Sequence, residues 1–226
     1  MPSVRGPTSE VRRHPNRDFL RELLIRCGIA EGSDEALAFL CYLALLEKWN
    51  VRVNLTSTTD WELLGPLFEE AIWAAGFYPD AAAAHLDIGS GAGFPALLMR
   101  VLRPRMRLTM VEPRGKRAAF LETAVHELGL NDSAVFRGRL EDLLESRAGA
   151  GPWDFVSWKA LKLGRRELSQ LLSQSGDEVQ FWIFHGARLP LDDAGQSMFR
   201  LLRRESFPGK GSWFLSILRK NVSRET

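Results

Sequence analysis

A short apolar strand that runs directly into a glycine-rich loop constrains the fold of this chain more than any other feature. The strand, 85–88, is followed at once by Gly89, Gly91 and Gly93. Glycines at such a turn let backbone N–H groups and a helix N-terminus approach a ligand at the carboxyl end of a strand. The pattern predicts an α/β domain with a mostly parallel sheet and a ligand site at that edge of the sheet.

Strands and helices alternate after this loop, as they do in βαβ units. Apolar runs predict further strands at 107–111, 134–136, 153–158 and 179–184. Helical patterns predict helices at 95–102, 116–128 and 164–174. A last apolar run at 211–219, together with 205–208, predicts a C-terminal antiparallel hairpin.

The first 80 residues have a different character. Residues 1–16 are rich in Arg and Pro and have almost no apolar periodicity, which predicts a mobile basic arm. Apolar stripes predict helices at 17–27, from Ser33 to about Trp49, and at about 60–76. We therefore expect an N-terminal helical unit over 17–80, which caps a ligand-binding domain over 81–226.

Composition excludes several classes of protein. With 226 residues, 30 Lys+Arg and 28 Asp+Glu, the net charge is only +2, so the chain cannot hold nucleic acid by bulk charge alone. Cys27 and Cys41 stand apart from each other and from any Cys/His cluster, which argues against a disulfide framework and a metal site. Without an apolar leader or membrane span in the sequence, we expect a soluble, cytoplasmic protein.

The spacing of the glycines distinguishes between cofactors. A dinucleotide site needs its third glycine three residues after the second, where this chain has Phe94, and NAD is therefore disfavoured. Asp87 instead precedes Gly89 by two residues, and a carboxylate there suits a cationic ligand. The pattern Asp87-x-Gly89-x-Gly91-x-Gly93 resembles the first motif of class I S-adenosylmethionine-dependent methyltransferases, which bind a sulfonium cofactor.

Two later segments agree with this cofactor. Glu112 ends the second strand, where an acid can accept both hydrogen bonds of a ribose diol. Arg139 begins the segment after the third strand, where the resemblance implies contacts to the adenine ring. The alternatives are that the glycines form only a tight turn and that Glu112 is a solvated charge. The expected cofactor-binding residues are Asp87, Gly89, Gly91, Gly93, Phe94, Glu112, Arg139, Leu140 and Glu141.

Residues on both sides of the loop resemble one particular family. The matching segments are Trp49-Asn50 with Asn54-Leu55-Thr56-Ser57, the glycine loop with Pro95, Gly115-Lys116-Arg117, His126-Glu127-Leu128-Gly129-Leu130, and Arg137-Gly138-Arg139-Leu140-Glu141. Over about 35–220 the sequence is similar to the RsmG (GidB) family of bacterial 16S ribosomal RNA guanine-N7 methyltransferases. The resemblance implies a Rossmann-like class I methyltransferase fold, S-adenosyl-L-methionine as cofactor, and 16S rRNA or the small ribosomal subunit as partner.

Departures from the family fall on the substrate side. Residues 65–68 replace an Arg-His pair, Trp158-Lys159-Ala160 replaces Ser-Arg-Ala, and His185-Gly186 replaces Lys-Gly. Lys is not equivalent to Arg at a bidentate contact. Two alternatives therefore stay open: a methyltransferase that acts on another RNA or a small molecule, and a non-catalytic RNA-binding or assembly factor that kept the fold.

Methylation of guanine N7 needs no general base, because this nitrogen carries a free lone pair at neutral pH. We therefore expect no general base, with Arg139 and Lys159 as candidates for positioning. The candidate RNA-binding residues are Lys116, Arg117, Lys159, Lys162 and Arg165, and each could instead be a solubilising surface charge. Trp158 is expected in the core, with base stacking as the alternative, and His185 is expected to be structural. We expect a monomer.

Overall fold

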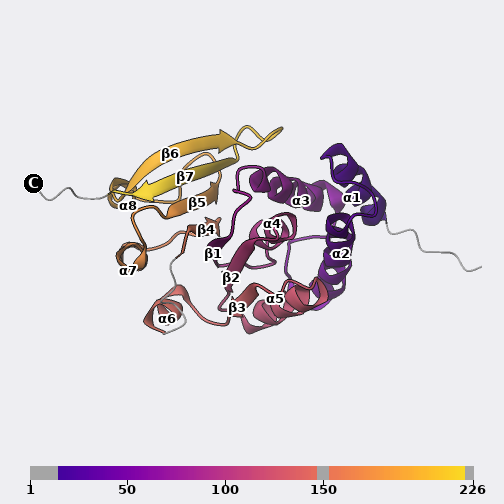
Figure 1. The fold of residues 1–226 in the computed structure, drawn as a ribbon, viewed down its shortest axis with the longest axis horizontal. Helices are drawn as coiled ribbons and strands as arrows, with labels where there is room; N and C mark the ends of the chain where they lie inside the picture. The colour runs from indigo at the N-terminus through magenta and orange to yellow at the C-terminus, as the bar shows by residue number, and fades with distance from the viewer. Residues whose placement is uncertain (1–14, 147–152, 222–226) are drawn as a thin grey trace, which may run out of the picture.

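The structure is a computed structural model that describes residues 15–146 and 153–221. Residues 1–14 of the predicted basic arm lie outside the described residues. A seven-stranded sheet in the order β3-β2-β1-β4-β5-β7-β6 forms the centre of the molecule (Figure 1). Its strands are β1 (Ala83–Ile88), β2 (Met106–Val111), β3 (Ser133–Phe136), β4 (Phe155–Lys159), β5 (Gln180–His185), β6 (Phe199–Ser206) and β7 (Phe214–Lys220).

Strands β1 to β5 pair in parallel, and β7 pairs antiparallel with both β5 and β6. This confirms the predicted parallel sheet with a C-terminal hairpin. β6 is an outer strand, and its register with β7 shifts at a bulge between Leu201 and Arg203. At the other side of the sheet, β3 has only four residues.

Helices cover both faces of the sheet (Figure 1). One face carries α1 (Pro15–Arg26), α2 (Asp34–Val53), α3 (Trp61–Ala75), α4 (Ala96–Leu102) and α5 (Gly115–Glu127). The other carries α6 (Leu140–Glu145), α7 (Arg165–Gln174) and the short α8 (Asp193–Ser197). The helices cover the faces of the sheet and leave the carboxyl ends of the parallel strands free. The loops that follow these strands meet at this edge.

Alternation along β1 separates the two cores. Leu86 and Ile88 are packed in the core beneath α6 and α7. Successive strand residues point to opposite faces, and His85 stacks on Tyr78 and Phe155 on the other side. The core on that side also contains the apolar residues of α1 to α3, so the packing of the predicted helical unit is continuous with that of the sheet.

Several boundaries differ from the predictions, and α1 begins at Pro15, so the last two residues of the predicted mobile arm are helical. The second helix continues to Val53 rather than ending near Trp49, and Asn54 then ends it in a left-handed conformation at φ 40°. β6 begins at Phe199 rather than 205, since its exposed arginines hide the strand pattern. The short helices α6 and α8 were not predicted, because five or six residues are too few to show helical periodicity.

Candidate cofactor and substrate site

The glycine loop crosses the carboxyl ends of β1 and β2. Gly89, Gly91 and Gly93 have φ values of 70°, 60° and 90°, a region that L side chains rarely adopt. The Gly89 N–H donates to the Val111 carbonyl at 2.8 Å, which ties the loop to the end of β2. A Cβ at Gly93 would lie 2.9 Å from Cβ of Leu97. All three glycines are therefore favoured by conformation, and Gly93 is required by space as well.

Helix α2 packs against the glycine loop. The buried Tyr42 hydroxyl donates to the Ala92 carbonyl at 2.6 Å. The Phe94 ring packs edge-on against Tyr42 and Phe68, with ring centroids 5.4 and 5.2 Å apart. Because the Phe94 ring lies in this core, only its backbone is available to a cofactor.

Glu112 lies at the end of β2 with its carboxylate against the loop. One oxygen accepts a hydrogen bond from the Gly91 N–H at 2.9 Å, and the other accepts one from the Arg114 N–H at 2.8 Å. Each carboxylate oxygen can accept a second hydrogen bond. Glu112 is thus fixed in orientation and still has capacity for two hydroxyl groups of a ligand.

Asp87 is the final acceptor in a buried series of hydrogen bonds next to the glycine loop. Its Oδ1 accepts from the Ser157 hydroxyl at 2.6 Å, and the Ser157 oxygen lies 2.8 Å from Nε2 of His85. Since the hydroxyl proton is used toward Asp87, the Nε2–H of His85 must be the donor of the second bond. Burial raises the pKa of Asp87 to about 6 and lowers the pKa of His85 to about 3. At neutral pH the chain therefore places one negative charge at the loop.

A cavity of about 420 Å³ opens on the α6 side of the loop. Arg139, Leu140 and Glu141 line it from the start of α6, opposite Gly89 and Val111. Its lining residues are Ile88, Gly89, Val111, Pro113, Arg114, Arg139, Leu140, Glu141, Leu161, Leu163 and Glu167. Apolar walls with charged groups at the rim and this volume are usual for a small-molecule site. The structure thus brings the predicted adenine segment to the glycine loop.

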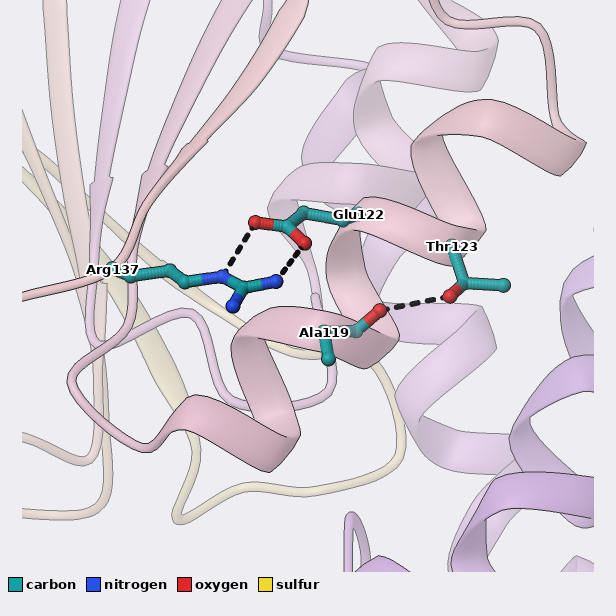
Figure 2. A network of polar contacts seen from close by, with 4 residues as sticks. All are labelled: Ala119, Glu122, Thr123 and Arg137. Atoms are coloured by element: carbon teal, nitrogen blue, oxygen red, sulfur yellow. Dashed lines mark hydrogen bonds and ion pairs between the residues drawn. The ribbon is translucent and has the colours of Figure 1, made fainter.

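The segment before α6 is fastened to α5. Figure 2 shows the Arg137 guanidinium facing the Glu122 carboxylate of α5, with Nε 2.7 Å from Oε1 and a second N–H on the other oxygen. In the same helix the Thr123 hydroxyl donates to the Ala119 carbonyl at 2.8 Å. This bidentate ion pair holds the segment just before Arg139 against α5.

Arg117 links the loop to the segment that follows α2. One of its guanidinium nitrogens donates to the Asn54 carbonyl at 2.9 Å, and the other lies 3.8 Å from where a Cβ on Gly91 would be. The Asn50 side chain accepts from the Thr56 N–H at 2.9 Å, which orders this segment. Arg117 therefore lies beside the glycine loop and remains partly exposed.

The other candidate cations lie around this edge. Lys116 is exposed at the start of α5. Lys162 is exposed between β4 and α7, and Arg165 is exposed at the start of α7; both are close in sequence to the cavity residues Leu161 and Leu163. Lys159 ends β4, and its Nζ lies 2.8 Å from Oε2 of Glu70 in α3.

Glu70 was missed by sequence reasoning. It is 3% exposed, although Glu69 beside it lies on the surface in a pair with Arg26. The available signal was its place one helical turn before the buried Ala74, on the apolar side of a helix. A charged residue at such a position needs a partner, and Lys159, 89 residues later, could not be identified from the sequence.

Other predicted roles are resolved by packing. Trp158 is completely buried in the core beneath α7, as expected, so it does not stack on a base. His185 is held between the Gly186 carbonyl and the Ser216 hydroxyl, at 2.6 and 2.9 Å, which agrees with a structural role. Over residues 15–146 and 153–221, no group of three or more His, Cys, Asp or Glu side chains could hold a metal ion, and no helix could span a membrane.

Comparison with known proteins finds a matching family model and similar sequences. The family model described as rRNA small subunit methyltransferase G matches residues 36–189. A ribosomal RNA small subunit methyltransferase G of Streptococcus pyogenes serotype M5 (strain Manfredo) is 33% identical in an alignment of 154 residues that covers 64% of this chain and 62% of that protein. The match thus spans less than two thirds of the relative's length.

Solved structures with low sequence identity share the fold. MtNAS in complex with MTA and tNA superposes with a TM-score of 0.57 at 16% identity, covering 92% of this chain and 86% of that one. A SAM-dependent methyltransferase from Aquifex aeolicus superposes with a TM-score of 0.55 at 15% identity, covering 79% and 98%. The predicted class I methyltransferase fold is confirmed.

Proposed function

Because the chain belongs to the rRNA small subunit methyltransferase G family, we propose that it methylates 16S ribosomal RNA at N7 of a guanine, with S-adenosylmethionine as methyl donor. The observation that carries the proposal is the joint placement of the glycine loop, Glu112 and the cavity at Arg139–Glu141, all inside the matched segment. The setting is the cytoplasm, and the protein acts as a monomer.

Each part of the cofactor has a matching group. Glu112 would accept hydrogen bonds from the ribose hydroxyls, and the apolar cavity between Val111 and Leu140 would enclose the adenine ring. The charge of Asp87 favours a cationic amino-acid end near Gly89 and Gly91. When bound, S-adenosylmethionine supplies an electrophilic methyl group. The chain itself orients the donor and shields it from water.

No proton has to be removed from guanine N7 before transfer, so the protein needs only to align donor and acceptor. Alignment of two reactants can lower the activation free energy by up to about 7–11 kcal/mol. Lys159 and Arg139, on opposite sides of the glycine loop, are the groups that we assign to positioning. Lys116, Arg117, Lys162 and Arg165 are the cations proposed to hold RNA phosphates around this edge.

A binding titration is the first test. Calorimetry with S-adenosylmethionine and with S-adenosylhomocysteine should give micromolar affinities, while NAD as a control should not bind. Absence of binding by both methionine derivatives would contradict the cofactor assignment. It would favour an RNA-binding or assembly factor that has the fold without the activity.

A methylation assay then tests the substrate. Small ribosomal subunits and naked 16S RNA from a strain that lacks this methylation should each be incubated with the protein and labelled cofactor. Mass mapping should find one added methyl on a guanine base of 16S RNA. A protein that binds cofactor but leaves 16S RNA unmodified would have another target, as the departures at 65–68 and Lys159 would then explain.

A further inference from the structure

A polar cluster lies at the end of β4 on the side of the sheet opposite the adenine cavity. It consists of Lys159, Glu70 from α3 and Trp213 from the segment before β7. The Lys159 ammonium is 2.8 Å from Oε2 of Glu70 and 5.5 Å from the centre of the Trp213 ring. None of these contacts is needed for the cofactor contacts assigned above.

Two buried polar atoms of this cluster have unused hydrogen-bonding capacity. Oε1 of Glu70 and Nε1 of Trp213 are both buried and have no hydrogen-bond partner in the described part of the chain. A buried ion pair stabilises a fold only when its remaining hydrogen-bonding capacity is also satisfied. The Lys159 ammonium still has N–H donors after its bond to Glu70, and its side chain is 19% exposed. Lys159 is therefore the member that can donate to a ligand.

The position of Lys159 relates the cluster to methyl transfer. β4 pairs with β1 so that Trp158 lies opposite Ile88, and Lys159 is thus level with the start of the glycine loop. Its charge also lowers the pKa of Asp87 against the effect of burial, which places the two groups within electrostatic range. Beyond it, Ala160 turns the chain at φ 51° toward Leu161 and the cavity. A cofactor held in the cavity and on the loop would therefore have this cluster close to the glycine loop, on the other side of the sheet.

On the basis of the proposed function, we infer that Lys159 reads position 6 of the target purine and that Glu70 is the positioning residue that holds Lys159. Guanine carries an oxygen acceptor at position 6, next to N7, whereas adenine carries an amino donor there. A lysine ammonium can donate to the oxygen and cannot accept from the amine. Lys159 would therefore admit guanine, with N7 facing the donor, and reject adenine.

Glu70 has a second effect through charge. In the transfer, the N7 lone pair forms the new N–C bond, the electrons of the S–C bond return to sulfur, and the positive charge moves to the purine. An unpaired ammonium at O6 would repel that charge. The carboxylate of Glu70, 2.8 Å from Nζ, offsets the Lys159 charge as the cation forms.

Four variants test this assignment on small subunits that lack the methylation. Lys159→Met should lower kcat/KM about 10- to 100-fold, and Lys159→Arg, which keeps charge and donors, should stay within about fivefold of wild type. Glu70→Gln should lower kcat about tenfold without changing the KM for S-adenosylmethionine. Glu69→Gln, the matched control on the same helix, should behave as wild type. All four should still bind S-adenosylmethionine, which also reports folding.

The RNA provides an independent arm that needs no variant. Subunits assembled with inosine at the target, which keeps O6 and lacks the 2-amino group, should be methylated within a few-fold of the normal rate. Adenosine there should abolish methylation. Normal transfer by Lys159→Met, or to adenosine, would overturn the inference and leave the proposed function standing. Failure of the wild-type protein on every subunit would overturn both.

Discussion

At the residue scale, the buried environment of Asp87 changes its ionisation. Asp87 is 3% exposed, and its carboxylate accepts the Ser157 hydroxyl while the neutral His85 ring lies behind that serine. A buried acid of this kind is ionised at neutral pH at a cost to folding. The cost is consistent with a charge kept for a cationic ligand rather than for stability.

Stability should therefore depend on pH through Asp87. Its pKa of about 6 in the fold exceeds the ordinary value of 3.8, so its contribution is fully present below 3.8 and is lost as pH rises through about 6. Between pH 5 and 7.5 the free energy of unfolding of the wild type should fall by about 1–2 kcal/mol more than that of Asp87→Asn. Urea unfolding at both pH values measures this difference.

The comparison with the variant is needed because His85 works in the opposite direction. Its pKa of about 3 in the fold lies below the ordinary 6.5, so its contribution falls as pH is lowered. His85 is present in both proteins, and its effect cancels in the difference. Identical pH dependence of wild type and Asp87→Asn would show that Asp87 is not buried as a charged group.

Glu112, which we propose as the ribose-binding residue, gives a second prediction at the residue scale. Glu112→Ala removes the acceptor expected for the ribose hydroxyls and leaves the Gly91 N–H without its bond. Loss of such charge-assisted bonds should weaken S-adenosylmethionine binding by about 1–3 kcal/mol, measured by calorimetry. Glu145→Ala, an exposed position on α6, serves as the control. Unchanged affinity of Glu112→Ala would place the ribose elsewhere.

At the scale of elements, the loop between β6 and β7 is fastened to α3. Phe207 is 3% exposed and packs edge-on against Trp73, with ring centroids 5.5 Å apart. Its N–H donates to the Trp213 carbonyl at 2.8 Å, so it also helps to place Trp213 beside Lys159. The C-terminal hairpin in this way contributes to the surroundings of Lys159, where we propose that the substrate binds.

Removal of that anchor should affect both stability and catalysis. Phe207→Ala should lower the free energy of unfolding by about 3–5 kcal/mol through loss of buried contacts, measured by chemical denaturation. Leu202→Ala on the neighbouring strand, where the side chain is 41% exposed, should change it by less than about 1 kcal/mol. A small effect of Phe207→Ala would mean that the hairpin is held by β7 alone.

Sequence periodicity was sufficient for the order and type of the longer elements. Leu86 and Ile88, followed by three glycines, specify a buried strand and its turn within a few neighbouring residues. Contacts between distant segments could not be predicted in this way. Tyr42 and Ala92 are 50 residues apart, and Glu70 and Lys159 are 89 residues apart, so each pair depends on the three-dimensional packing of helices on the sheet.

At the scale of the whole molecule, the proposed cofactor site exists only in the folded chain, because its groups come from β1, β2 and the start of α6. A ligand that binds only the folded state stabilises it, by about 2.7 kcal/mol at 100 times its dissociation constant. For a chain of this length we expect S-adenosylmethionine to raise Tm by roughly 5–10 °C in a thermal scan. An equal shift with NAD would contradict the assigned specificity.

The two outer strands of the sheet affect whether molecules of this protein can associate edge to edge in a crowded solution. An open strand edge offers unpaired N–H and C=O groups to any other chain with a free edge. Here one edge, β3, is only four residues long, and the other, β6, carries Arg200, Arg203 and Arg204 together with a bulge. Charge repulsion and irregular spacing oppose continuation of the sheet from one molecule into the next. The fold thereby limits aggregation while newly made chains are concentrated.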